Sequence, residues 1–235
     1  MTDAIDAVLF DLDDTLLDGD AAWRAGIDQV LLRCPEVGRA AALSAWEAAF
    51  REHYPRYLAG ELTQQECQLA RIRSWAALVP VTVAPGTEAS WFGDYQAGYE
   101  AGWAAFADVA GCLSALQGMR LGIVTNGDSV MQRAKLDTLG LGLAFEVVVA
   151  SGDIGIAKPD PRIFHHCAQR LGLPPARCLY VGDRRDTDAL AAQAAGMTAI
   201  WLNRRGIDAP DDQVREITTL AALAEMVPPA TPPLS

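Results

Sequence analysis

The chain has 235 residues, of which 51 % are hydrophobic and 21 % charged, so it is long enough for one large globular domain or for a domain with a sizeable insertion. Its formal net charge of −11 argues against a nucleic-acid partner, because such a partner needs a basic patch and the longest basic runs are pairs such as Arg184 and Arg185. No apolar run approaches the length of a membrane span, and the acids near the N-terminus argue against a signal peptide. The five cysteines are scattered and form no CxxC pair, which argues against a disulfide framework. We therefore expect a cytoplasmic protein.

Five short apolar stretches, rich in β-branched residues and ended by turn formers, predict the buried strands of a parallel sheet. They lie at 5–10, 121–124, 147–150, 178–181 and 199–202. Helical patterns separate the later strands, for example at 129–139 and 163–171. Strands that alternate with helices predict βαβ units and therefore a doubly wound α/β fold.

About a hundred residues separate the first two predicted strands, and this stretch is rich in Ala, Trp and charged residues. Segments 42–54 and 63–78 have helical spacing, and Thr63 is a candidate N-cap for the second of them. Five of the six tryptophans fall here, and we expect them to fill the core of a small helical bundle.

The sequence therefore predicts an α/β core into which a helical domain is inserted. We expect the core at 1–18 and 106–227 and the helical insertion at 19–105. The Pro-rich segment 228–235 lacks periodicity and is predicted to be a disordered tail.

Polar residues follow four of the predicted strands, at the edge of an open α/β sheet where ligands bind. The candidate site residues are Asp11, Asp13, Thr125, Asn126, Lys158, Asp183 and Asp188. Carboxylates can hold Mg²⁺, which prefers oxygen ligands, and the metal offsets their mutual repulsion. A hydroxyl, an amide and an ammonium can hold phosphate oxygens, so this set of groups favours phosphoryl transfer.

Asp11 and Asp13 are spaced for two different tasks in such a reaction. An Asp carboxylate can attack phosphorus and form an aspartyl-phosphate. A second Asp two positions on projects to the same side of an extended chain, where it can protonate the leaving oxygen and later deprotonate water. Only two of the 19 basic residues are lysines, Lys135 and Lys158, and Lys158 falls where an ammonium is wanted.

Four segments, DLDDT, VTN, AKPDP and GDRRDTD, resemble in this order the four motifs of the haloacid dehalogenase (HAD) superfamily. DLDDT is similar to the DxDxT signature of its phosphatase branch. The resemblance runs from residue 5 to about residue 205 and implies a Rossmann-like core, with the insertion at the place of the family's helical C1 cap.

The resemblance also implies a role for each site residue. Asp11 corresponds to the nucleophile and a metal ligand, and Asp13 to the general acid/base, whose backbone carbonyl also binds the metal. Thr125 would bond the phosphate with help from Asn126, and Lys158 would hold both nucleophile and phosphate.

The fourth motif implies the remaining metal ligands. Asp183 corresponds to a ligand, and Asp188 to a ligand or a residue that supports one. Asp186 lies beside Asp188, which leaves open which of the two approaches the metal, although the spacing to Gly196 favours Asp188. Thr15 is expected to order the loop after the nucleophile.

The predicted function is therefore Mg²⁺-dependent hydrolysis of a small phosphorylated metabolite. Several stretches are similar to phosphatases of nucleoside 5′-monophosphates and of sugar phosphates, and a nucleotidase-like or generalist activity is favoured. A phosphosugar mutase of the same superfamily is the alternative within enzymes. A phospho-accepting signalling module is a second alternative, disfavoured because the candidate Asp lies on the first strand and a large insertion follows. The sequence carries no signal for an oligomer interface.

Overall fold

The computed structural model describes residues 5–208 and 211–226, and the chain divides into two units. The first unit joins Met1–Asp18 to Ala105–Ser235, and the second is Gly19–Ala104. Residue 105, predicted to end the insertion, belongs to the first unit. The predicted tail at 228–235 lies outside the described residues.

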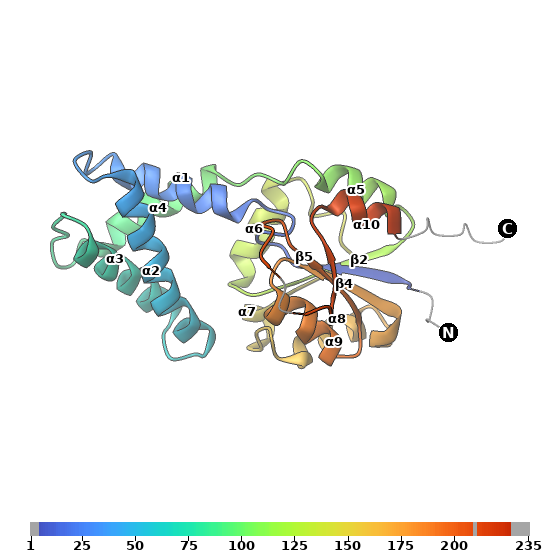
Figure 1. Ribbon diagram of the computed structural model, residues 1–235. Helices are drawn as coiled ribbons and strands as arrows, with labels where there is room; N and C mark the ends of the chain where they lie inside the picture. The colour runs from blue at the N-terminus through green and yellow to red at the C-terminus, as the bar shows by residue number, and fades with distance from the viewer. Residues whose placement is uncertain (1–4, 209–210, 227–235) are drawn as a thin grey trace. The chain divides into compact units, whose positions relative to one another are not determined.

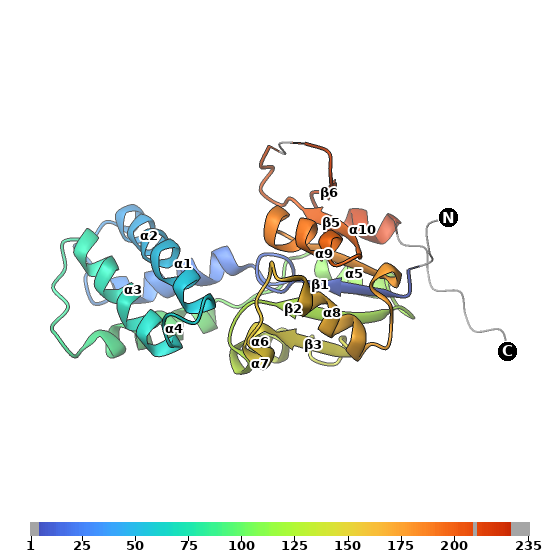
Figure 2. The same ribbon diagram turned by 90° about the horizontal axis from the view of Figure 1, so that it is seen from below.

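A parallel sheet forms the centre of the first unit, as predicted, and Figure 2 shows three of its strands, β1, β2 and β3, side by side. Within residues 5–208 and 211–226 it has six strands, in the order β3-β2-β1-β4-β5-β6. They are β1 (Ala7–Phe10), β2 (Arg120–Thr125), β3 (Val147–Ala150), β4 (Cys178–Gly182), β5 (Thr198–Leu202) and β6 (Arg215–Ile217). Phe10 at the end of β1 pairs with Ile123 on one side and Val181 on the other. All four residues of β1 are fully buried, because helices cover both faces of a doubly wound sheet.

Helices cover this sheet on both faces, with α5 and α10 on one and α8 and α9 on the other (Figure 1). The helices of the first unit are α5 (Val109–Ala115), α6 (Ser129–Thr138), α7 (Ser151–Ile154), α8 (Pro161–Arg170), α9 (Ala191–Ala194) and α10 (Leu220–Met226), with the short turns η1 (Pro175–Arg177) and η2 (Arg185–Leu190). Helix α8 buries Ile163 and Phe164, with Cys167 four and three residues after them, against the sheet. The doubly wound α/β fold is thereby confirmed.

The order of the strands reverses next to β1. The chain runs from β1 to β2 and β3 on one side, and then crosses to β4 and β5 on the other side of β1. In open α/β sheets, ligands bind at such a switch point, beyond the carboxyl ends of the strands. The fold therefore directs attention to the residues that follow β1, β2 and β4.

The second unit contains four helices within residues 19–104, α1 (Gly19–Leu31), α2 (Arg39–Leu58), α3 (Gln64–Leu78) and α4 (Glu88–Ala101). The predicted N-cap is confirmed, because the Thr63 hydroxyl accepts from Glu66 N–H and the Glu66 carboxylate accepts from Thr63 N–H. Trp46 and Trp75 are buried in the helical core, with Trp23 and Trp91 packed against it, so the predicted packing role is confirmed for these four. The fifth, Trp103, lies outside this cluster and contacts Tyr99 edge-on. Helices α1 and α4 approach closely, since a Cβ on Gly98 would lie 2.6 Å from the Ala25 carbonyl oxygen.

No helix in the described part of the chain has both the length and the apolar character that crossing a membrane requires.

A partly buried ion pair between Asp108 and Arg204 joins three segments of the first unit and offers a test of its stability. The Asp108 carboxylate accepts two hydrogen bonds of 2.9 Å from Arg204, one of 2.8 Å from the Thr219 hydroxyl and one of 2.9 Å from Leu220 N–H. Burial favours a higher pKa for Asp108, but these hydrogen bonds and the Arg204 charge outweigh it and lower the pKa. The start of α5 is thus tied to the segment after β5 and to the start of α10.

Replacing Asp108 with Asn is expected to lower the free energy of unfolding at neutral pH by about 2–3 kcal/mol, because Arg204 loses its charged partner. Since the folded pKa of Asp108 lies below the ordinary value of 3.8, the carboxylate stabilises the fold above that pH and the stabilisation is lost as pH falls through the folded pKa. Urea unfolding at neutral pH and near pH 3 should show the difference between wild type and variant shrinking in acid. Asp186→Asn is the control, because that carboxylate is 84 % exposed, and equal stability of the two variants would refute the role of Asp108.

Candidate active site

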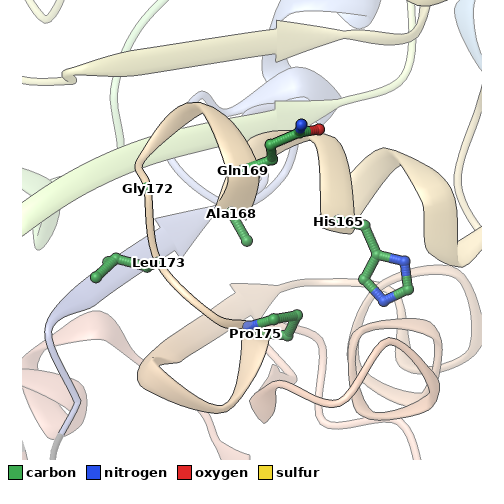
Figure 3. A pocket seen from close by; sticks show the side chains of 6 residues that line it. All are labelled: His165, Ala168, Gln169, Gly172, Leu173 and Pro175. Carbon is green, nitrogen blue, oxygen red and sulfur yellow. The ribbon is translucent and has the colours of Figure 1, made fainter.

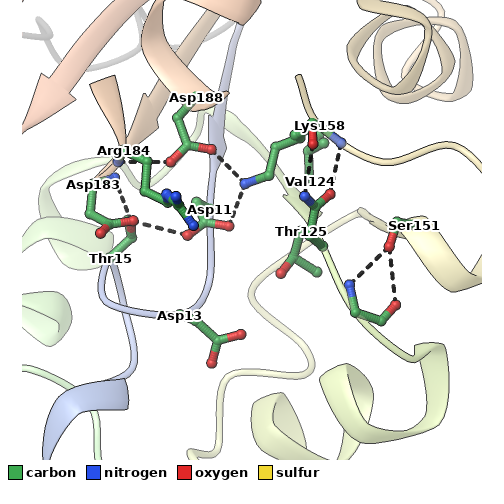
Figure 4. A network of polar contacts seen from close by, with 12 residues as sticks. Asp11, Asp13, Thr15, Val124, Thr125, Ser151, Lys158, Asp183, Arg184 and Asp188 are labelled. Atoms are coloured by element: carbon green, nitrogen blue, oxygen red, sulfur yellow. Dashed lines mark hydrogen bonds and ion pairs between the residues drawn. The ribbon is translucent and has the colours of Figure 1, made fainter. Parts of the chain in front are cut away.

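Asp11 follows β1 directly and is held in line with the sheet. Its N–H donates to the Val181 carbonyl at 2.9 Å, which continues the pairing of β1 with β4 by one residue. The carboxylate is buried and faces the side chains that follow the neighbouring strands (Figure 4). The local sequence explains this placement. Asp11 directly follows the apolar strand β1, which lies between β2 and β4, so its side chain lies at the carboxyl ends of the central strands.

Lys158 links the carboxylates of the predicted site. Its ammonium lies 2.6 Å from Asp11 Oδ1 and 2.6 Å from Asp188 Oδ1 (Figure 4). It also lies 3.0 Å from the Tyr180 hydroxyl. The lysine side chain is 4 % exposed, and its three contacts match the three hydrogens of an ammonium. Burial disfavours the charge, but Asp11 and Asp188 outweigh this effect and raise the pKa of Lys158, so the group stays protonated.

Asn126 places Lys158 through its main chain. The Asn126 Nδ2 donates to the Lys158 carbonyl at 2.9 Å, and the Lys158 N–H donates to Asn126 Oδ1 at 2.8 Å. Both ends of the amide are thus engaged by the loop after β3. In the structure Asn126 positions the lysine, while its contact with phosphate stays a prediction.

Three carboxylates come together where a cation could bind. Oxygen atoms of Asp11, Asp183 and Asp188 lie within 4.8 Å of one another. Gly182 makes room for this arrangement, because a Cβ there would lie 2.6 Å from the Asp188 side chain. Asp186 is 84 % exposed, so Asp188 is the member of the pair that joins the cluster.

Thr15 lies where the sequence predicts a residue that orders the loop after the nucleophile, and Arg184 and Arg185 each contact an acid of the first unit. The Thr15 hydroxyl donates to Asp11 Oδ2 at 3.4 Å and accepts from Asp183 N–H at 3.1 Å, so it ties the loop after β1 to the loop after β4. Arg185 forms an ion pair with Asp211, and the Arg184 N–H donates to Asp188 Oδ2 at 2.9 Å.

The crowding of these acids disfavours their full ionisation. Burial, with the charges of Asp188 and Asp13, raises the pKa of Asp11 to about 7 although Lys158 opposes the shift. Burial and the charges of Asp11 and Asp188 also raise the pKa of Asp183 well above its usual value. Two cations, Lys158 and Arg205, which lies 3.6 Å from Asp183 Oδ2, do not balance three acids. Three carboxylates suit a hard divalent cation, so the residues fit the predicted Mg²⁺.

Asp13 lies apart from the Lys158 network, in the turn that follows β1 (Figure 4). The turn is compact, with Asp14 at a φ of 60° and its N–H donating to the Leu17 carbonyl at 2.8 Å. The Asp13 side chain is 34 % exposed, so a reacting molecule can reach it. The two carboxylates of the DxD pair thus have different environments, because the Asp11 side chain is only 8 % exposed and the Asp13 side chain is accessible.

Thr125 and Asp13 share a neighbour that the sequence interpretation did not include. Gln132 Nε2 lies 2.6 Å from Thr125 Oγ1 and 2.9 Å from Asp13 Oδ2. Lys135 Nζ lies 2.6 Å from Asp13 Oδ1. Two features of the sequence could have indicated these residues. Lysine is scarce in the chain, which sets Lys135 apart, and a spacing of three residues places Gln132 and Lys135 on the same face of a helix.

A shallow hollow on the first unit lies outside this site (Figure 3). It is lined by His165, Ala168, Gln169, Gly172, Leu173 and Pro175. The His165 Nε2 lies 3.0 Å from the Ala195 carbonyl oxygen, so this ring nitrogen has a partner within the fold. None of the predicted site residues lines the hollow.

Comparison with known proteins gives the same family as the motifs. The family model described as haloacid dehalogenase-like hydrolase matches residues 5–196. The pyrimidine 5′-nucleotidase YjjG of Escherichia coli (strain K12) is 29 % identical over 226 residues, which cover 94 % of this chain and 96 % of the relative. The glyceraldehyde 3-phosphate phosphatase of Methanopyrus kandleri is 35 % identical over 204 residues, which cover 85 % of this chain and 84 % of the relative.

Among solved structures, the magnesium-bound HAD-hydrolase YfnB of Bacillus subtilis is similar in fold. Its TM-score is 0.80 at 24 % identity, and the match covers 95 % of this chain and 99 % of the other. At this identity the likeness supports the shared fold.

Proposed function

The chain belongs to the haloacid dehalogenase-like hydrolase family and is therefore an enzyme of the hydrolase class, and we propose that it hydrolyses small phosphomonoesters through a phosphorylated Asp11. The observation that carries the proposal is the pairing of a buried carboxylate, Asp11, with an accessible one, Asp13, two residues further on. Two relatives that match most of this chain are named as a nucleotidase and a phosphatase, which supports the same chemistry.

In the proposed reaction Asp11 attacks the phosphorus, and the bond from phosphorus to the leaving oxygen breaks as Asp13 donates a proton to that oxygen. A water then attacks the phosphorus of the aspartyl-phosphate and gives a proton to Asp13, and the bond from phosphorus to Asp11 breaks. Lys158 and the Thr125 hydroxyl hold the phosphate oxygens during both transfers. Asp11 ends as it began, and the net reaction consumes one water.

We propose that Asp11, Asp183 and the backbone carbonyl of Asp13 hold Mg²⁺, with Asp188 as a further ligand or as support for the others. The bound cation would offset the negative charge that the carboxylates and the phosphate bring together. The five cysteines are free and buried, which supports the expected cytoplasmic location.

Removal of divalent cations is expected to lower phosphate release at least about 100-fold, because the carboxylates would repel an incoming phosphate. The measurement is the inorganic phosphate released from 4-nitrophenyl phosphate in excess EDTA. Addition of Mg²⁺ beyond the EDTA should restore the wild-type rate. A rate that does not respond to EDTA would contradict the metal assignment.

The substrate class is proposed to include nucleoside 5′-monophosphates or sugar phosphates. A screen of phosphorylated metabolites with Mg²⁺ tests this directly, and inactivity on all of them would overturn the phosphatase proposal. One phosphate released per substrate consumed separates a phosphatase from a phosphosugar mutase, which keeps the phosphate. A long-lived phosphoprotein without turnover would instead indicate a signalling module.

A further inference from the structure

Helix α6 presents two buried polar side chains to the proposed site. Gln132 and Lys135 are three residues apart and lie on one face of the helix. Burial of an ammonium or an amide is costly unless each finds a polar partner. Lys135 is also one of only two lysines in the chain, whose other positive charges are arginines.

The two side chains contact both oxygens of the Asp13 carboxylate. Lys135 Nζ lies 2.6 Å from Oδ1, and Gln132 Nε2 lies 2.9 Å from Oδ2. A partly exposed Asp can otherwise adopt several rotamers, and one donor on each oxygen fixes both the position and the plane of the carboxylate.

Gln132 also acts on Thr125. Its Nε2 carries two hydrogens and has three acceptors, Thr125 Oγ1 at 2.6 Å, Asp13 Oδ2 at 2.9 Å and the Asn126 carbonyl oxygen at 3.3 Å. The two shorter contacts take the two hydrogens most directly. When the Thr125 oxygen accepts this hydrogen bond, its own hydrogen has to point elsewhere. That hydrogen is then available for a phosphate oxygen.

We propose that Lys135 and Gln132 are positioning residues, which hold the Asp13 carboxylate for proton transfer and orient the Thr125 hydroxyl for phosphate binding. The inference rests on the proposed function. The four motifs that define the site contain neither residue, so the pair adds a contact from helix α6 to the site.

The test compares two substrates that differ in their need for a proton. The leaving group of an alkyl phosphate such as glycerol phosphate has to be protonated, whereas 4-nitrophenolate leaves without a proton. For each substrate, kcat/KM reports the transfer of the phosphoryl group to Asp11 and not the later hydrolysis of the aspartyl-phosphate. Lys135→Met is expected to lower kcat/KM about 100-fold for the alkyl phosphate and less than about 5-fold for 4-nitrophenyl phosphate.

Gln132→Met should lower kcat/KM for both substrates, because Thr125 is affected as well, and should lower it further for the alkyl phosphate. In an Asp13→Asn background, Lys135→Met should cause no additional loss, since the lysine acts through Asp13. Arg133→Met is the matched control, because Arg133 lies on the same helix and pairs with Asp153. The control should leave the ratio between substrates unchanged.

An equal loss on both substrates, or a selective loss in Arg133→Met, would overturn the positioning role. If Lys135→Met does not fold, Lys135→Arg, which keeps the charge and moves its donors, should show a smaller selective loss, and no selective loss would again overturn the role. If the wild-type protein releases phosphate from neither substrate, the proposed phosphatase function itself is wrong. Failure of the positioning role and failure of the proposed function therefore give different results.

Discussion

Replacing Asp11 with Asn is expected to reduce kcat for phosphate release at least about 10⁴-fold while the protein stays folded. An amide cannot form the acyl-phosphate, but it has the shape of the carboxylate and its oxygen can still accept from Lys158 at the same place. The measurement is phosphate release at saturating Mg²⁺, together with the melting temperature.

The stability of this variant follows from the electrostatics. Burial raises the pKa of Asp11 to about 7, above the unfolded value of 3.8, so ionising this group costs folding free energy increasingly as pH rises between these values. Asp11→Asn is free of that cost, and its melting temperature near neutral pH should equal or exceed that of wild type. Asp186→Asn, an exposed acid of the fourth motif, should retain full activity. Near-normal turnover by Asp11→Asn would refute the nucleophile.

Most of the candidate site could be predicted from local sequence because the relevant residues follow strands. In a parallel sheet the carboxyl ends of the strands meet at one edge, so an acid after β1 and an acid after β4 come together whatever the rest of the chain does. The same reasoning cannot find Gln132 or Lys135. Their roles depend on where α6 lies in space, and within their own helix they look like ordinary polar positions.

Strand β6, which the sequence did not predict, has a similar explanation. The sequence interpretation contained five strands, while the structure adds β6, whose three residues are Arg215, Glu216 and Ile217. A short edge strand needs neither an apolar run nor alternation, because it is exposed along one side. Asn203 N–H donates to the Ile217 carbonyl and the Asn203 side chain donates to Glu216, so contacts made after folding define this strand.

Each of the two lysines contacts a different acid of the DxD pair. Lys158 contacts Asp11, whose side chain is mostly buried, and Lys135 contacts Asp13, whose side chain is 34 % exposed. A nucleophile benefits from a dry environment, whereas an acid/base has to exchange protons with the leaving group and water. The pairing thus gives each carboxylate an environment suited to its proposed task.

Replacing Lys158 with Met is expected to abolish turnover and to lower the free energy of unfolding by about 3–5 kcal/mol in EDTA. The substitution leaves Asp11, Asp183 and Asp188 together without the cation that contacts two of them, and it leaves the Tyr180 hydroxyl without that donor. Uptake of a proton by one carboxyl limits the loss. Urea unfolding at neutral pH measures it.

The other lysine is the matched control, because Lys135→Met removes an equally buried ammonium from a carboxylate that water can still reach. Its cost in EDTA should be smaller, about 1–2 kcal/mol, since an exposed acid regains hydration. Mg²⁺ should recover part of the stability of Lys158→Met, because a cation that binds the same carboxylates in the folded state alone shifts the equilibrium towards folding. Equal losses of unfolding free energy in Lys158→Met and Lys135→Met would contradict this role of Lys158, as would a Lys158→Met stability that does not respond to Mg²⁺. Either result would mean that the acids at the end of β1 are tolerated for a reason other than the charge of Lys158.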